Sequence, residues 1–238
     1  MNNLGYSTGD IALGDFTRAI KILKKHPFHA IKLSALRINE VEPLINALPQ
    51  LDLSSYKYVS FHAPSAFAES DEEHLVSLLQ KLPVTWPIVL HPDTIHDFSL
   101  WKVLADRLAI ENMDRRKSTG RSVIELRKIF TYLPTAKMCL DIGHARQVDS
   151  SMIETFLLLT EFRDKIVQLH VSEVDTSSRH DVLSIAAQMA FRQLRPFIPQ
   201  NAAIIVESRV SEPDIDREAE SVANTLTVPS AIPLMADG

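Results

Sequence analysis

The sequence predicts a (β/α)8 TIM barrel that forms one domain over residues 1–238. Three observations predict this class: short apolar segments with the character of buried strands occur eight times, helical segments alternate with them, and the intervals leave room for crossover helices. Eight parallel strands close this kind of barrel. A doubly wound open sheet is the alternative, but its glycine-rich phosphate loop is missing after the first strand, in a chain with only six glycines.

The strands are expected where the chain is continuously apolar, as in parallel sheets that are buried on both faces. In chain order they are residues 3–7, 29–34, 58–61, 87–90, 107–110, 138–140, 166–169 and 202–206. Each one ends at a polar residue or at a turn. The first is followed by Thr8, Gly9 and Asp10, and the third by His62.

The helices are expected where apolar residues recur with helical spacing. They are residues 15–25, 40–48, 72–82, 98–105, 121–132, 152–162, 183–197 and 214–225. The first of them places Phe16, Ile20 and Leu23 on one face. Pro196 and Pro199 are expected to close the seventh, because proline cannot continue a helix.

The composition is typical of a globular protein, with 45% hydrophobic and 23% charged residues and a formal net charge of -5. A nucleic-acid partner would therefore need a local basic patch. The N-terminus lacks the pattern of a signal peptide and no apolar run could span a bilayer, so we expect a cytoplasmic protein without a membrane partner. Cys139, the single cysteine, is expected in the core. The tail from about residue 226 is expected to be loose or packed against the barrel floor.

The segment 137–145 contains the motif around which the other candidate residues can be arranged. A short apolar strand is followed by Asp141 and then by His144. A carboxylate at the end of a buried strand needs a strong partner, because an unpaired charge is costly in an apolar setting. Gly143 is expected to allow a sharp turn, so that Asp141 and His144 face one ligand.

Other strands end in the same way. The residues at or just past the ends of the third to eighth strands are His62, His91, Glu111, Asp141 with His144, His170 and Glu207. In a barrel these ends meet at one mouth, where active sites of this fold lie. Histidine and carboxylate together suit Zn²⁺, Mn²⁺ or Fe²⁺, and so many carboxylates without a cation would repel one another. Taken singly, each of these residues could instead be a structural histidine or a salt-bridged carboxylate.

The strand-end motifs resemble those of the endonuclease IV branch of the xylose isomerase-like barrels. The resemblance covers residues 58–208 and rests on Phe-His-Ala-Pro at 61–64, Leu-His-Pro at 90–92, Ile-Glu-Asn at 110–112, Cys-Leu-Asp-Ile-Gly-His-Ala at 139–145 and Ile-Val-Glu-Ser at 205–208. It implies a shared ligand set and additional ligands of that branch. The shared set is Glu111, Asp141, His170 and Glu207, and the additional ligands are His62, His91, His144 and His180.

The sequence also departs from this branch. Ser178 stands where the branch has the aspartate of an Asp-x-His motif, which removes one ligand of a third ion. Ser65 stands where the branch tends to have an aromatic residue, and the chain is short, so DNA-reading loops should be reduced. The pair Arg179-His180 is also similar to one in sugar isomerases, where the arginine helps to hold the substrate.

Several cations are expected near the mouth. Arg115 and Arg116 follow the fifth strand, and Lys32 and Arg37 belong to or follow the second. They could hold a phosphate or another anion, or they could lie on solvated loops.

Three functions remain open. The first is phosphoester hydrolysis with two or more divalent ions, Zn or Mn before Fe or Mg, on a phosphorylated small molecule or damaged DNA. His62, His91 and Glu111 would hold one ion. Glu111 would also bind a second ion, which is held by Asp141, His170 and Glu207. His144 and His180 would bind a third ion or the phosphate.

The second function is isomerisation or epimerisation of a sugar or sugar phosphate. One ion would lie on the shared set, Glu111 and Glu207 would act as acid and base, and His144 and Arg179 would orient the sugar. The third is a non-catalytic barrel with a structural metal site. The full set of candidate ligands argues against it, because a structural zinc site needs only four ligands.

Overall fold

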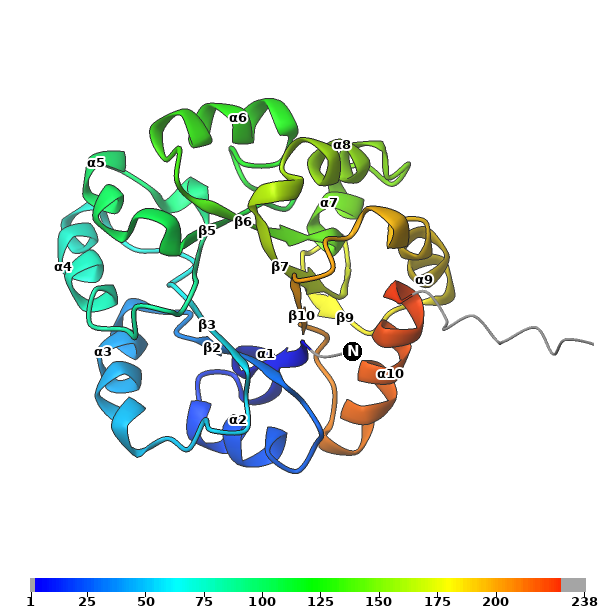
Figure 1. Cartoon of the computed structure of the whole chain (residues 1–238), viewed down its shortest axis with the longest axis horizontal. Helices are drawn as coiled ribbons and strands as arrows, with labels where there is room; N and C mark the ends of the chain where they lie inside the picture. The colour runs from blue at the N-terminus through cyan, green and yellow to red at the C-terminus, as the bar shows by residue number, and fades with distance from the viewer. Residues whose placement is uncertain (1–2, 228–238) are drawn as a thin grey trace, which may run out of the picture.

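The computed structural model of the chain describes residues 3–227, in which eight parallel strands close a barrel in the order β1-β10-β7-β6-β5-β4-β3-β2 (Figure 1). The strands are β1 (Leu4–Ser7), β2 (Ala30–Ser34), β3 (Tyr58–His62), β4 (Ile88–Leu90), β5 (Leu108–Glu111), β6 (Lys137–Asp141), β7 (Ile166–Val171) and β10 (Ala203–Val206). The predicted fold class is confirmed, and each predicted strand overlaps an observed one.

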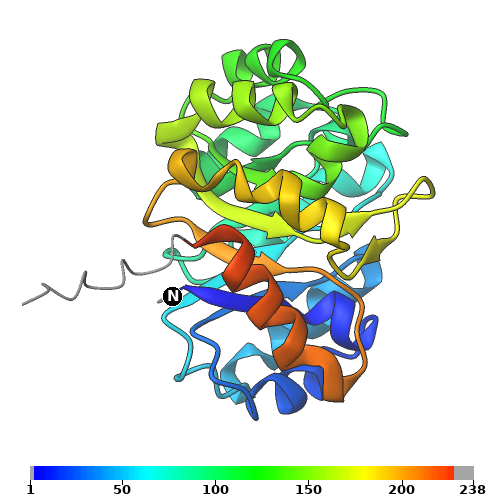
Figure 2. The same cartoon turned by 90° about the vertical axis from the view of Figure 1, so that its right-hand side faces the viewer.

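Helices surround the barrel and cover the outer face of its strands (Figures 1 and 2). They are α2 (Phe16–Leu23), α3 (Ile38–Ala47), α4 (Glu69–Leu79), α5 (Phe98–Trp101), α6 (Val123–Tyr132), α8 (Ile153–Glu161), α9 (Ile185–Arg192) and α10 (Ile215–Leu226). Helix α9 ends before the predicted stop at Pro196, because the chain passes into a 3-10 turn at Arg195–Phe197. Helix α5 likewise continues only as a 3-10 segment, which Ala105 interrupts with a φ of 47°.

Two helices and one hairpin at the carboxyl ends of the strands were not expected from the sequence. Helix α1 (Thr8–Ala12) follows β1 directly, and α7 (Ile142–Val148) follows β6 directly. Strands β8 (Glu173–Val174) and β9 (His180–Asp181) form an antiparallel hairpin after β7. All three lie at the carboxyl ends of barrel strands, so they shape the mouth.

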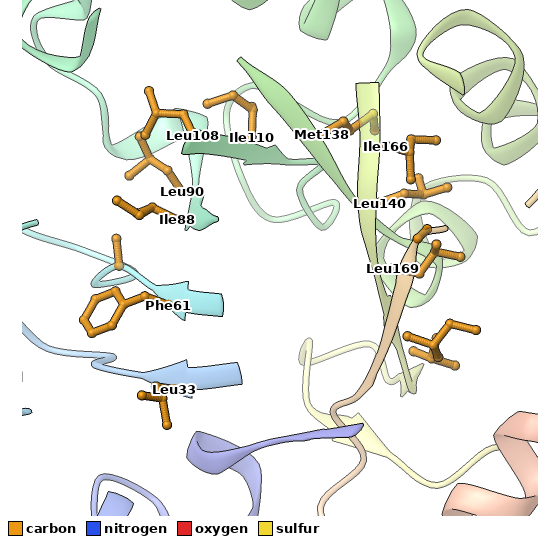
Figure 3. Close-up of a cluster of buried hydrophobic side chains, with 14 of the residues drawn as sticks. Leu33, Phe61, Ile88, Leu90, Leu108, Ile110, Met138, Leu140, Ile166 and Leu169 are labelled. Carbon is orange, nitrogen blue, oxygen red and sulfur yellow. The ribbon is translucent and has the colours of Figure 1, made fainter. Parts of the chain in front are cut away.

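Alternation along each strand separates the hydrophobic core from the barrel interior. Outward-facing residues pack between the strands and the helices, among them Leu33, Phe61, Ile88, Leu90, Leu108, Ile110, Met138, Leu140 and Leu169 (Figure 3). The residues between them along the strands point inward, where Val89, Ala109 and Cys139 form a separate small cluster. Cys139 is buried, as predicted.

The register of the strands brings the predicted site residues to one level. Asp141 on β6 is paired with His170 on β7, and His170 is paired with Ile205, two residues before Glu207. No helix in residues 3–227 is both long and apolar enough to cross a membrane. The predicted loose tail falls chiefly on residues 228–238, which lie outside the described part of the chain.

Candidate metal centre

A cavity of about 290 Å³ opens at the carboxyl ends of the barrel strands. The predicted ligands that line it are His62, His91, Glu111, His144, His180 and Glu207. Asp141 and His170 are also there, fully buried beneath the lining. The structure therefore brings together all eight residues that were expected to bind metal.

These residues form three groups whose candidate ligand atoms lie within 4.8 Å of one another. The groups are His62, His91 and Glu111; then Glu111, Asp141, His170 and Glu207; and then Asp141, His144 and His180. Glu111 belongs to the first two groups and Asp141 to the last two. A carboxylate has two oxygens, so each of these residues can serve two neighbouring positions.

The first group has the donor arrangement of a cation site. His62 Nδ1 lies 2.6 Å from the carbonyl oxygen of Ala63, which can only accept, so Nδ1 carries the proton. Burial, followed by the charge of Lys32, lowers the pKa of His62 to about 4, so the ring is neutral at pH 7. Its Nε2 lone pair then faces Glu111 Oε2 at 3.2 Å, and His91 Nε2 lies 3.4 Å from the same oxygen. Lone pairs that converge on a carboxylate fit a cation held between them.

Glu111 lies at the centre of the site and is 1% exposed. Its Oε1 is 3.0 Å from His170 Nδ1, on the opposite side from the two histidines at Oε2. Burial by itself would raise the pKa of Glu111, but His170, through its charge and its hydrogen bond, lowers it well below its usual range. Glu111 is therefore an ionised carboxylate that joins two groups of ligands.

Asp141 occupies the N-cap of α7 and accepts a 2.7 Å hydrogen bond from the backbone N–H of His144. Burial and the nearby charge of Glu207 raise the pKa of Asp141 well above its usual range. Its other oxygen, Oδ2, is buried and accepts no hydrogen bond from any residue that the structure describes. His144 Nδ1 lies 3.3 Å from this oxygen but closer, at 3.0 Å, to the carbonyl oxygen of Asn112. A divalent cation would satisfy the buried acceptor.

The expected role of Gly143 is wrong. Gly143 makes no sharp turn but lies inside α7. A Cβ atom there would stand 2.6 Å from the carbonyl oxygen of Ser172 and 2.7 Å from Val174 Cγ2. The glycine is required because α7 passes very close to the chain that follows β7. This contact, and the cap formed by Asp141, place His144 over the mouth.

The third group includes both histidines that were expected to bind a third ion or a phosphate. The rings of His144 and His180 have centroids 5.3 Å apart. His180 Nδ1 lies 2.8 Å from Ser172 Oγ and 3.4 Å from Glu207 Oε2. Ser178, which replaces the aspartate of the resembling branch, also lines the cavity.

Lys32 is a buried cation inside the site, with 2% exposure. Its Nζ donates a hydrogen bond to Glu207 Oε1. Burial opposes the charge of Lys32, but Glu207, Asp10 and Glu111 together raise its pKa above the usual value. Burial would likewise raise the pKa of Glu207, but His170, Lys32 and His180 lower it below the usual range. Glu207 is thus held ionised.

The sequence did not reveal Asp10 and Arg209 as site residues. Asp10 lies on the unexpected helix α1, and Arg209 Nε is 3.8 Å from its Oδ1. Both line the cavity. Burial and the charge of Glu207 raise the pKa of Asp10. The only sequence indication is that Asp10 follows the first strand, a position that is equally typical of a turn residue.

The predicted anion-binding cations divide into two sets. Arg116 lines the cavity, as does its neighbour Lys117. The structure does not bring Arg37, Arg115 or Arg179 to this lining. Arg37 is paired with Glu40 at 3.2 Å, and Arg179 with Asp175 at 2.8 Å.

Comparisons with known proteins show what the fold is similar to. No protein-family model matches the chain, and no curated protein matches it. Endonuclease IV from Thermus thermophilus is 17% identical, with a TM-score of 0.58, over 94% of this chain and 98% of that one. A 3-keto-D-glucoside 4-epimerase from E. coli is 14% identical, with a TM-score of 0.56, over 94% and 99% of the two chains.

A xylose isomerase domain protein from Alicyclobacillus acidocaldarius subsp. acidocaldarius is 11% identical, with a TM-score of 0.62, over 94% of this chain and 98% of that one. Identities this low establish a common fold and nothing finer. The chain therefore shares the (β/α)8 barrel fold with these three proteins.

Proposed function

We propose that this chain is a divalent-metal-dependent phosphoester hydrolase that acts on a small phosphorylated molecule. The observation that carries the proposal is the position of Glu111 between two ligand groups, with His62 and His91 on one oxygen and His170 on the other. A four-residue set alone would hold one ion, and the two additional histidines supply a neighbouring position. Zn²⁺ or Mn²⁺ suits ligands that combine imidazole with carboxylate.

The residues of the chain have distinct tasks in this proposal. His62, His91 and Glu111 would hold one ion, and Glu111, Asp141, His170 and Glu207 a second. Bound divalent ions would supply Lewis-acid stabilisation of the negative charge that develops on the phosphoryl oxygens.

Cationic side chains would orient the phosphate. Lys32, Arg116, Lys117 and Arg209 line the same cavity as the ligands. His144 and His180, which face one another across the third group, would donate hydrogen bonds to phosphate oxygens or hold a third ion. Because Asp141 and His170 are fully buried, bulk water is excluded from the floor, where electrostatic interactions are consequently stronger.

The size and charge of the site favour a small substrate over duplex DNA. The cavity has a volume of about 290 Å³, and the chain has a net charge of -5. Binding to a duplex relies on many phosphate contacts from basic residues, which a net acidic chain must gather in a local patch. Arg37, Arg115 and Arg179, which could have extended such a patch, do not line the cavity.

The test combines metal analysis with two assays. Protein purified without chelators should contain at least two divalent ions per chain and should cleave a simple phosphodiester such as bis(p-nitrophenyl) phosphate. His91→Ala should abolish cleavage, whereas His96→Ala, at an exposed histidine that does not line the cavity, should not. An abasic-site duplex serves as the second substrate and should be cleaved poorly. A single ion on the four-residue set, with no cleavage of either substrate, would overturn the proposal.

A metal-dependent sugar isomerase or epimerase is the second candidate. The observation that favours it is that Glu111 and Glu207 lie 3.0 and 3.2 Å from the same atom, His170 Nδ1. Two carboxylates on either side of one ligand could serve as acid and base across a bound sugar. Proton exchange between solvent and a sugar carbon, in protein with one ion per chain, would identify this reaction.

A further inference from the structure

A chain of polar groups crosses the barrel interior beneath the candidate metal centre. The Tyr58 hydroxyl donates to Gln168 Oε1 at 2.9 Å, and Gln168 Nε2 lies 2.6 Å from His170 Nε2. Tyr58 is on β3 and Gln168 on β7, and three strands separate these two in either direction around the barrel. The hydrogen bonds therefore join opposite walls.

Gln168 precedes His170 by two residues, so both side chains point into the barrel. Both residues are fully buried. An amide placed in such a position costs free energy unless its groups are paired. The apolar residues that usually fill a barrel interior would avoid this cost. Gln168 therefore costs more free energy in the barrel interior than an apolar residue would. Its contact with the candidate ligand His170 indicates a role at the metal centre.

The orientation of the Gln168 amide decides which tautomer of His170 fits beside it. An amide N–H can only donate, so His170 Nε2 accepts and a neutral ring carries its proton on Nδ1. Nδ1 then donates to Glu111 Oε1 at 3.0 Å. This arrangement satisfies every partner without an ion, but it is the wrong tautomer for a ligand, because Nδ1 faces the carboxylates and has no free lone pair.

We propose that Gln168 is a positioning residue for His170 and that its amide reverses when a divalent ion is bound. This inference rests on the metal-dependent function proposed above. In the reversed state the proton is on Nε2 and donates to Gln168 Oε1, which leaves the Nδ1 lone pair facing Glu111 and Glu207. Gln168 Nε2 then donates to the Tyr58 oxygen. The ring loses one proton at Nδ1 and gains one at Nε2, so it stays neutral.

The shape of the amide makes this reversal possible without any movement of the backbone. The oxygen and nitrogen of the carboxamide are nearly the same size, and a half-turn about its last bond exchanges them. Tyr58 can take either role, because a hydroxyl both donates and accepts. The second ring nitrogen of a histidine ligand usually donates to such a partner, and loss of that partner typically weakens metal binding about 10–100-fold.

The first test is Gln168→Met, which keeps the length of the side chain and removes the amide contacts to Tyr58 and His170, together with a longer one of 3.8 Å to Cys139 Sγ. Co²⁺ binding is measured by visible absorption and calorimetry. The affinity that is compared is that of the ion held by His170, which is identified as the one that His170→Ala no longer binds. We expect about 10–100-fold weaker binding in Gln168→Met. Ser60→Ala is the matched control and should bind like the wild type, because Ser60 is buried on β3 but its Oγ has no partner among the described residues.

The second test reads the tautomer directly and needs no variant. Nitrogen-15 spectra of His170 should show the proton on Nδ1 in metal-free protein and on Nε2 after Zn²⁺ is added. Equal Co²⁺ affinity in Gln168→Met and wild type, or an unchanged tautomer with Zn²⁺ bound, overturns this inference alone. If the wild type binds no divalent ion, the proposed function falls as well. Should Gln168→Met not fold, the tautomer measurement decides.

Discussion

Asn112 and Asp141 are joined by two hydrogen bonds between the side chain of the first and the backbone of the second. Asn112 Nδ2 donates to the carbonyl oxygen of Asp141 at 2.8 Å, and its Oδ1 accepts from the N–H of Asp141, also at 2.8 Å. The carbonyl oxygen of Asn112 lies 3.0 Å from His144 Nδ1. One residue next to Glu111 thus fixes the backbone of a second candidate ligand and the ring of a third.

Asn112→Ala should destabilise the protein and weaken its metal binding. The substitution leaves the buried N–H and carbonyl groups of Asp141 without these partners, at a cost of about 1–3 kcal/mol for each group. Urea unfolding of the metal-free protein measures the loss. The exposed Asn46→Ala on α3 is the control and should change stability by less than about 0.5 kcal/mol. Equal stability of the two variants would contradict the role of Asn112.

Removal of metal should lower the melting temperature. An ion that binds only the folded state stabilises it by about 2.7 kcal/mol when its free concentration is 100 times its dissociation constant. Protein treated with a chelator and dialysed should therefore melt earlier, and Zn²⁺ or Mn²⁺ should restore the original temperature. His62→Ala should reduce the increase, whereas His74→Ala on the outer helix α4 should keep it. A melting temperature that is indifferent to both ions would contradict the site.

The stability of the metal-free protein should depend on pH through His62. Its pKa is about 4 in the folded protein, against an ordinary value of 6.5, because of burial and then the charge of Lys32, while Glu111 opposes the shift. The unfolded chain therefore binds the proton more strongly between these values. The contribution of His62 to the free energy of unfolding is therefore complete above about pH 6.5 and is lost as the pH falls toward 4.

His62→Gln cannot titrate at this position, so it should lose less stability than the wild type between pH 7 and pH 5. Urea midpoints of both proteins at the two pH values measure the difference. Glu111 and Asp141 are present in both proteins, so the comparison isolates the contribution of His62. If the urea midpoint changed by the same amount between pH 7 and pH 5 in both proteins, a lowered pKa of His62 would be ruled out.

Gly143→Ala should destabilise the fold through a steric clash rather than through backbone strain. The added Cβ would lie 2.6 Å from the Ser172 carbonyl oxygen, which cannot move independently of β7 and β8. Overpacking of this kind typically costs about 1–3 kcal/mol, although alanine is the better helix former. The exposed Lys128→Ala on α6 is a helical control with little expected change. A more stable Gly143→Ala protein would contradict the close approach of α7.

The sequence by itself determined the barrel and most of the candidate ligands. Parallel strands buried on both faces leave a continuous apolar pattern, and the carboxyl ends of eight such strands necessarily meet at one mouth. For that reason His62, His91, Glu111, Asp141, His170 and Glu207 could be grouped from their positions after strands. His144 was found with them because it follows Asp141 by three residues.

Only the tertiary structure decided which neighbours complete the site. Asp10 reaches the mouth because a short helix follows β1 directly, and Gly143 packs tightly because α7 follows β6 directly. Gln168 meets Tyr58 because strands far apart in the sequence face each other across a closed barrel. Arg37 and Arg179 form ion pairs with nearby carboxylates instead of facing the cavity. Such contacts depend on the paths of loops and the directions of side chains, and the local hydrophobic pattern of the sequence predicts neither.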